Sequence, residues 1–203
     1  MKKRIIIFLF TMLCLSVNSL TIFAIQFSDL ANTHWAYGNI MSLAGEGIIN
    51  GYENGTYQPE RAISRGEFIK LVMTTLYGGN EYFEVNNFNF GHWAMPYALE
   101  AMQKGYLMDG TTLDNLNNSI TRLEMVNILG KVGINNKIYR ANELNSISFS
   151  DINGLEESSK IYIAYVTRNG LINGYTDGTF KPNKTLTRAE VATIIVRFKT
   201  LQG

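Results

Sequence analysis

Three segments of this 203-residue chain are copies of one another. The clearest match aligns GIINGYENGTYQPERAISRGE at residues 47–67 with GLINGYTDGTFKPNKTLTRAE at residues 170–190, without a gap. A more diverged copy lies between them, from HWA at residues 92–94 to ITRLE at residues 120–124. A repeat of this length is typical of folds that are assembled from one small structural unit. The repeat therefore has to be explained before any single motif.

Each copy has the pattern of two helices joined by a loop. Apolar residues recur at helical spacing in the first helix: Trp35, Ile40, Met41 and Ala44; Tyr97, Ala98, Ala101 and Met102; Ile161, Tyr162, Tyr165 and Val166. The second helix has its buried face at Phe68, Leu71 and Val72; Met125, Ile128 and Leu129; Val191, Ile194 and Ile195. Two short helices cannot bury their own apolar sides. We therefore predict an all-α fold, a pseudo-threefold bundle of three helix–loop–helix repeats at residues 25–78, 88–134 and 147–199.

Helix boundaries are marked in every copy. A glycine that can adopt the left-handed C′ conformation ends the first helix, at Gly47, Gly105 and Gly170. The second helix begins after Ser64, Thr121 and Thr187. Each of these residues is followed three positions later by a glutamate, Glu67, Glu124 or Glu190. This spacing predicts a capping box, in which the two residues exchange side-chain-to-backbone hydrogen bonds.

An arginine stands at the first position of the second helix in every copy, as Arg65, Arg122 and Arg188. A cation is unfavourable there by about 0.3–1 kcal/mol, because the helix dipole is positive at its N-terminus. Its recurrence predicts a negative partner. Free N–H groups at a helix start and the guanidinium fork both suit a carboxylate or a phosphate. The alternative is an internal salt bridge, for example to Asp29 or Asp151. We expect the three arginine-bearing helix starts to lie on the periphery of the bundle.

Trp35 and Trp93 each follow a histidine at the start of the first helix. A large ring at helical spacing is either a core residue or a flat surface for a sugar, with an N–H to donate. The histidines, His34 and His92, have no neighbouring Cys, His or paired carboxylate, so we expect solvent-exposed helix-start residues and no metal, cofactor or catalytic site. The Asp177-Gly178-Thr179 stretch lacks the alternating ligands of a calcium loop and predicts a turn.

Residues 1–24 have the layout of a secretory signal peptide. Three basic residues at positions 2–4 precede an apolar run at 5–17, and Ala24 offers a cleavage point. An uncleaved membrane anchor is an alternative, and a lipoprotein signal through Cys14 is a weaker one. We expect no stable membrane span after cleavage, since a span needs about 20 apolar residues.

The charge content argues against a nucleic-acid-binding protein, and the cysteine content argues against a disulfide-stabilised one. The chain has 18 Lys and Arg against 17 Asp and Glu, and loss of the three bases near its start leaves 15 against 17. The remaining chain has no basic tract to neutralise phosphates, which argues against a nucleic-acid partner. Its single cysteine, Cys14, lies in the predicted signal peptide, so the exported part has no disulfide and relies on its apolar core.

The motifs resemble those of S-layer homology (SLH) domains. The resemblance rests on FSD at residues 27–29 and 149–151, HWA at 34–36, the glycine-rich loop, and TRAE at 187–190, and it extends from residue 27 to about residue 199. It implies a pseudo-threefold bundle whose grooves between repeats bind a secondary cell-wall polysaccharide. In many members the ligand ends in a pyruvylated N-acetylmannosamine, whose carboxylate would supply the expected anion.

Departures from the family pattern distinguish the grooves. Copy two has Phe90 where Asp is expected and Leu123 in place of the small Ala, and copy three has no Trp. Family grooves combine the Arg of one repeat with the Asp, Trp and loop of the next. We therefore expect the third-to-first junction to dominate binding and Arg122 to contribute least. The full set of predicted glycan-binding residues is Arg188, Asp29, Trp35, Gly51, Tyr52, Arg65, Trp93, Arg122, Asp151 and Gly174.

The sequence predicts a secreted protein that is held non-covalently at the cell wall or S-layer by a wall polysaccharide. The alternatives are an envelope subunit that binds another envelope protein, or a tether between peptidoglycan and an outer membrane. An enzyme is not expected, because no paired acids or nucleophile–base arrangement is present. Members of the family usually anchor a larger region, so this chain is interpreted as an anchor without cargo, a recruiting subunit or a truncated product.

Overall fold

The computed structural model describes residues 25–78, 91–108, 113–135 and 148–202. These residues form helices α1 Tyr37–Gly45, α2 Arg65–Tyr77, α3 Met95–Gln103, α4 Arg122–Asn135, α5 Glu157–Arg168 and α6 Arg188–Gln202. Between the described residues, β-pairing is limited to isolated bridges, so the predicted all-α fold class is confirmed. The predicted signal peptide and Phe90 lie outside the described residues. In the part that is described, every helix is too short or too polar to cross a membrane.

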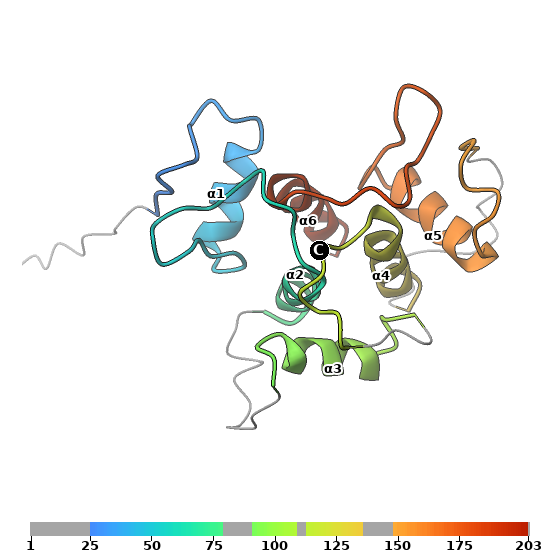
Figure 1. Cartoon of the computed structure of the whole chain (residues 1–203), viewed down its shortest axis with the longest axis horizontal. Helices are drawn as coiled ribbons and strands as arrows, with labels where there is room; N and C mark the ends of the chain where they lie inside the picture. The colour runs from blue at the N-terminus through green and yellow to red at the C-terminus, as the bar shows by residue number, and fades with distance from the viewer. Residues whose placement is uncertain (1–24, 79–90, 109–112, 136–147, 203) are drawn as a thin grey trace, which may run out of the picture.

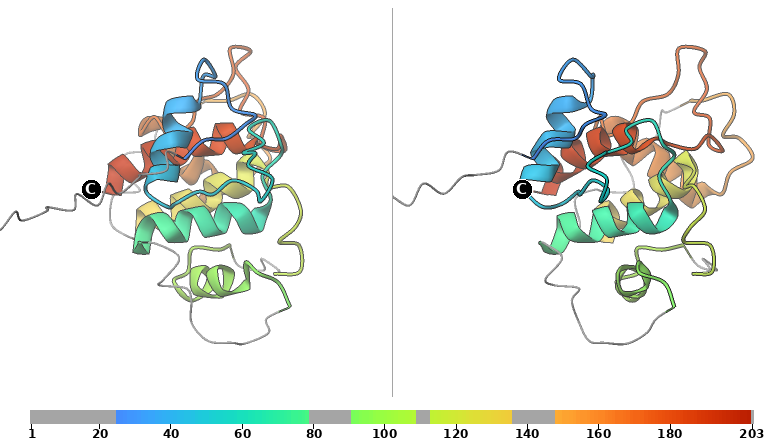
Figure 2. Two further views of the ribbon diagram at one scale, coloured as in Figure 1. Left: turned by 90° about the vertical axis from the view of Figure 1, so that its left-hand side faces the viewer. Right: turned by 60° about the vertical axis from the view of Figure 1, so that its left-hand side comes forward.

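The second helices of the three copies form the centre of the molecule. Figure 1 shows α2, α4 and α6 together, with α1, α3 and α5 around them, and Figure 2 shows the inner helices side by side. The main helix contacts pair α2 with α3, α4 with α5, and α6 with α1. Each outer helix therefore packs against the inner helix of a neighbouring copy, and the first copy packs against the third.

Backbone hydrogen bonds join the copies in the same order. Isolated bridges pair Ser64 with Ser119, Thr121 with Thr185, and Thr187 with Ala62, all next to the starts of the inner helices. The last of these bridges joins the third copy to the first. The copies thus close into a ring, which is the condition on which the predicted groove assignment rests. The pseudo-threefold symmetry of that ring stays a prediction.

The predicted helix ends are confirmed. Ser64 N–H donates to Glu67 Oε2 at 2.8 Å, and Ser64 Oγ accepts from Glu67 N–H at 3.2 Å. The same two bonds join Thr121 to Glu124 and Thr187 to Glu190. The glycines that follow the outer helices have positive φ angles, of 70° at Gly47, 71° at Gly105 and 65° at Gly170. Local signals in each copy are therefore sufficient to set the helix boundaries.

The predicted faces of the inner helices are buried, but the tryptophans are not. Phe68, Met125 and Val191 are fully buried, whereas Trp35 is 61% and Trp93 is 54% exposed. The interpretation of the tryptophans as core residues is therefore wrong. The alanine that follows each tryptophan, Ala36 or Ala94, is buried instead. At Ala94 the backbones of the first and second copies approach closely. A Cβ on Gly66 at the start of α2 would lie 2.9 Å from the Cβ of Ala94.

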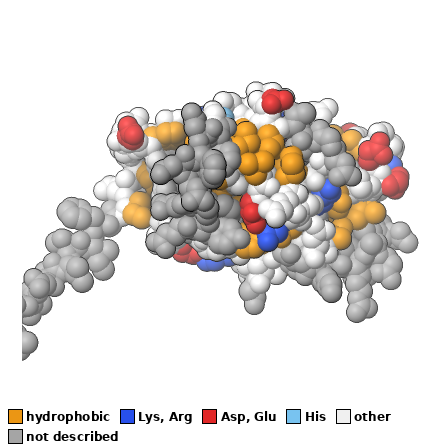
Figure 3. Space-filling model, turned by 90° about the horizontal axis from the view of Figure 1, so that it is seen from below, with side chains coloured by type: hydrophobic (Ala, Val, Ile, Leu, Met, Phe, Trp, Pro, Cys, Tyr) orange, Lys and Arg blue, Asp and Glu red, His pale blue; other side chains and the backbone are white. Residues whose placement is uncertain are grey.

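Helix α3 leaves part of its apolar side uncovered by the described residues. Leu99 is 40% and Met102 is 44% exposed. Figure 3 shows the molecule from below, the direction in which α3 lies in Figure 1, and hydrophobic side chains gather there beside acidic and basic ones. This face is therefore of mixed chemical character.

Candidate functional site

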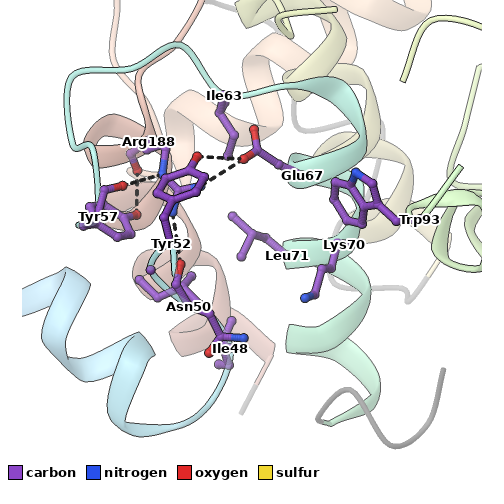
Figure 4. A pocket seen from close by; sticks show the side chains of 12 residues that line it. Ile48, Asn50, Tyr52, Tyr57, Ile63, Glu67, Lys70, Leu71, Trp93 and Arg188 are labelled. Atoms are coloured by element: carbon purple, nitrogen blue, oxygen red, sulfur yellow. Dashed lines mark hydrogen bonds and ion pairs between the residues drawn. The ribbon is translucent and has the colours of Figure 1, made fainter. Parts of the chain in front are cut away.

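A pocket of about 190 Å³ opens where the three copies meet (Figure 4). The first copy contributes the start of its loop and the inner face of α2, the second copy contributes Trp93, and the third contributes Arg188. Its walls consist of Ile48, Ile49, Asn50, Gly51, Tyr52, Tyr57, Ile63, Glu67, Lys70, Leu71, Trp93 and Arg188. Four predicted site residues meet here, namely Gly51, Tyr52, Trp93 and Arg188. We call this space the first-copy pocket.

Arg188 is buried, and its guanidinium is held by the first copy. Its Nε donates to the Tyr57 carbonyl at 2.8 Å and its Nη2 to the Asn50 carbonyl at 3.2 Å. Its Nη1 pairs with Glu67 Oε1 at 3.0 Å. The guanidinium carbon also lies 4.4 Å from the Tyr57 ring centre and 5.0 Å from that of Tyr52. The expected anionic partner is thus partly supplied from within the protein.

Arg122 enters the loop of the third copy in the same way. Its Nε donates to the Phe180 carbonyl at 2.8 Å and its Nη2 to the Asn173 carbonyl at 2.9 Å, and the Phe180 and Tyr175 rings flank it. Burial lowers the pKa of Arg122, and the nearby Tyr175, Glu190 and Asp151 oppose that shift. Among the described residues, none places a carboxylate within ion-pair distance of Arg122.

Arg65 makes the corresponding contacts with the second copy. Its Nη1 donates to the Asn115 carbonyl at 2.7 Å, and its Nη2 pairs with Glu124. Together with Ile69, Leu107, Met108, Asn127 and Ile128, this ion pair lines a second pocket of about 150 Å³. We call it the second-copy pocket.

The prediction that the arginine-bearing helix starts lie on the periphery is wrong. Arg122 is 5% and Arg188 is 8% exposed, and their helices are the central ones. The reason is that loop carbonyls of the next copy need N–H donors, which the guanidinium fork provides. The alternative of an internal salt bridge is correct for Arg65 and Arg188. The partners are the capping glutamates Glu124 and Glu67, and not the aspartates that the alternative named.

Asp29 and Asp151 brace the loops of their own copies. Asp29 accepts from the backbone N–H of Tyr57 at 2.7 Å and of Gln58 at 2.8 Å. Asp151 accepts in the same way from Phe180 and Lys181, both at 2.8 Å. Gln58 and Lys181 have left-handed φ angles of 58° and 56°, which cost energy in residues with side chains. The aspartates hold these strained turns, and Asp29 does not line the first-copy pocket.

Gly51 and Gly174 are needed for close packing. A Cβ on Gly51 would lie 2.5 Å from Phe27 Cε1 and 2.6 Å from the Thr56 carbonyl oxygen. A Cβ on Gly174 would lie 2.1 Å from Phe149 Cε1. The FSD motif thus places its aromatic ring directly on the loop glycine. The loop of the third copy contains the predicted turn, in which hydrogen bonds from Thr179 and Lys181 lower the pKa of Asp177 to about 2.

The tryptophans are surface platforms next to the histidines. Each ring lies 5.5 Å from that of the preceding histidine, whose Nδ1 accepts a backbone N–H at the helix start. Trp93 lines the first-copy pocket with Arg188, whereas Trp35 does not. The predicted pairing of Trp35 with Arg188 is therefore corrected to Trp93. The reason is that α3 packs on α2, so the tryptophan of the second copy reaches the loop of the first.

Sequence reasoning missed Lys70, which lines the first-copy pocket, and treated Glu67 only as a cap. A register comparison of the copies could have found Lys70. The position six residues after each N-cap is Lys70, Asn127 or Thr193, so only the first copy has a cation there. In the described part of the chain, His, Cys, Asp and Glu form no cluster of three that could hold a metal ion.

Comparison with known proteins identifies the repeat. The model of the S-layer homology domain matches residues 26–69 and 148–192, the first and third copies. This chain belongs to the S-layer homology family. The diverged copy between them lies outside the matched residues. Its inner helix α4 nevertheless has the same cap, and its Arg122 makes the same kind of contact with the loop of the next copy.

Relatives share this SLH region within longer proteins. Exoglucanase XynX of Acetivibrio thermocellus is 30% identical over 85% of this chain and 16% of its own length. The Cellulosome-anchoring protein of the same species is 29% identical over 74% of this chain and 35% of its own. An S-layer protein of Bacillus thuringiensis subsp. finitimus is 25% identical over 85% and 21%. This chain thus spans about a third or less of these relatives, and the enzyme name belongs to a protein that is matched only in this region.

Proposed function

We propose that this protein is a non-covalent cell-wall anchor that is secreted and binds a wall polysaccharide in the pockets between its SLH copies. The observation that carries the proposal is the first-copy pocket, which combines an exposed tryptophan of the second copy with hydrogen-bonded polar groups of the first and third copies. Two relatives are named for anchoring or for the S-layer, which supports the same function.

The walls of the first-copy pocket suit a sugar ring. Trp93 presents a flat apolar face, and the Tyr52 hydroxyl, which donates to Glu67 Oε1 at 3.4 Å, lies across from it (Figure 4). Sugar-binding sites need both features, because one face of a sugar ring is apolar and its hydroxyls need donors and acceptors. In its more specific form, the proposal is that the bound sugar is acidic, like the pyruvylated sugar that many members of the family bind.

The proposal is tested by sedimentation of the mature chain with purified walls, before and after the wall polysaccharide is extracted. We expect the chain to sediment with intact walls and to stay in solution with extracted ones. Trp93→Ala should weaken binding at least tenfold, about 1.4 kcal/mol. Trp35→Ala is the matched control, since it removes an equally exposed tryptophan from outside the pocket. Binding that survives extraction would overturn the proposal and favour a protein partner in the envelope.

A further inference from the structure

The charges of the two pockets differ by one side chain. In each pocket an arginine of one copy pairs with the capping glutamate of the next, Arg188 with Glu67 and Arg65 with Glu124. Within the lining of each pocket, the pair contributes one positive and one negative charge. Glu67 also pairs with Arg61, which lies outside the lining of the first-copy pocket. Among the described residues that line the first-copy pocket, Lys70 is the remaining charged one. The described lining of the second-copy pocket holds no charged residue beyond its ion pair.

Lys70 has no carboxylate within ion-pair distance in the described part of the chain. Its Nζ lies 5.8 Å from the centre of the Tyr97 ring, and burial lowers the pKa of Lys70. A cation that is partly removed from water without a compensating anion is an unfavourable arrangement. An anionic ligand in the pocket would relieve it. Figure 4 shows the lysine beside Trp93, on the side of the pocket away from Arg188.

The corresponding positions in the other copies are neutral and differ in their partners. Asn127 is 9% exposed, lines the second-copy pocket, and its Oδ1 has no hydrogen-bond partner. Thr193 Oγ1 accepts from Asn39 Nδ2 at 3.0 Å and donates to the Ala189 carbonyl at 3.3 Å. The residue at this position therefore varies between the copies, whereas the arginine and the glutamate recur.

We propose that Lys70 determines the specificity of the first-copy pocket by pairing with the carboxylate of an acidic sugar whose ring lies against Trp93. This inference rests on the proposed polysaccharide-binding function. Arg188 is the poorer partner for that carboxylate, because three of its N–H groups already bind Tyr57, Asn50 and Glu67. Arg188 shapes the pocket, and Lys70 supplies the charge that is still unpaired.

Calorimetry with purified wall polysaccharide, native or with its carboxyl groups reduced to alcohols, tests the assignment. Lys70→Met keeps most of the side-chain stem and removes the charge, so we expect at least tenfold weaker binding of the native polymer. Lys70→Arg should retain binding to within a few-fold. Lys160→Met in α5, which lines neither pocket, is the control and should bind as the parent does. If Lys70→Met binds the native polymer as tightly as the parent, the assignment is wrong.

A second measurement separates this inference from the proposed function. The side-chain NMR signal of Lys70 is titrated with pH in the parent protein, in the presence of glucuronate or of glucose. We expect glucuronate, and not glucose, to raise the pKa of Lys70, because the bound carboxylate stabilises the ammonium form. Equal pKa values in the two sugars would overturn the inference. Failure of the parent to bind wall polysaccharide, with the glucuronate shift present, would overturn only the anchoring function.

Discussion

Arg188 joins the third copy to the first through hydrogen bonds, an ion pair and two aromatic rings at once. The contact is reciprocal, because the Tyr57 hydroxyl donates to the Arg188 carbonyl at 3.3 Å. Burial raises the pKa of Tyr57 to about 12, so that donor keeps its proton at any physiological pH. Arg188, which the sequence suggested as a ligand-binding residue, thus makes contacts that hold the third copy to the first.

Substitution of Arg188 should therefore reduce stability as well as binding. Arg188→Lys keeps the charge but loses the planar fork, and we expect the free energy of unfolding to fall by about 1.5–3 kcal/mol. Arg188→Ala should cost more, since it also leaves the half-buried Glu67 without this partner. Urea unfolding measures both.

Lys199→Ala is the control for charge alone. It breaks an exposed ion pair with Glu46 and should change the free energy of unfolding by about 0–1 kcal/mol. An Arg188→Lys variant as stable as the Lys199→Ala variant would show that the buried fork contributes little.

The loops are shaped by close contacts that only certain residues permit. In the first copy the Phe27 ring packs on Gly51, and Asp29 holds the strained Gln58. In the third copy Phe149 and Asp151 do the same for Gly174 and Lys181. The FSD motifs of the first and third copies therefore shape the loops of those copies, and the motif of the first copy does so without lining the first-copy pocket.

Two Gly→Ala variants should change stability in opposite directions. Gly51→Ala places a Cβ against a ring and a carbonyl, and we expect a loss of about 1–3 kcal/mol. Gly38→Ala lies in α1, with nothing within 4 Å of the added Cβ, and should gain up to about 1 kcal/mol. Thermal unfolding of both variants measures the difference. A neutral Gly51→Ala would mean that the loop adjusts easily.

Features set by local sequence signals were easier to predict than contacts set by packing between copies. The helix ends were predicted because a capping box and a C′ glycine act within a few residues of each boundary. The partner of Trp93 was not, because it depends on α3 packing against α2 of another copy. The place of Lys70 in the lining of the first-copy pocket was missed for the same reason, since periodicity assigns a residue to a helix face and says nothing of what the neighbouring copy places opposite it.

The whole molecule is an interlocked ring rather than a row of units. Each outer helix packs on an inner helix of another copy, so a single copy on its own would lack the surface that buries its outer helix. In a linear repeat array, removal of a terminal copy breaks one interface. Here it breaks two.

The described core should therefore unfold as one cooperative unit. We expect a single calorimetric transition for residues 25–203, with equal calorimetric and van't Hoff enthalpies. A fragment of residues 25–135 lacks both α5 and α6, which cover α4 and α1, and should have lost most of its helical circular dichroism at 25 °C. A fragment with the helicity and melting temperature of the corresponding part of the full chain would contradict the ring.

Closure of the ring also fixes the order in which the protein can be completed during synthesis. The bond from Arg188 to the Tyr57 carbonyl spans 131 positions in the sequence, and loops of that length close at an entropic cost before any contact repays it. The loop of the first copy is made early by the ribosome but receives its last donors from one of the final helices. The nascent chain therefore stays open, and its pocket unformed, until α6 has emerged.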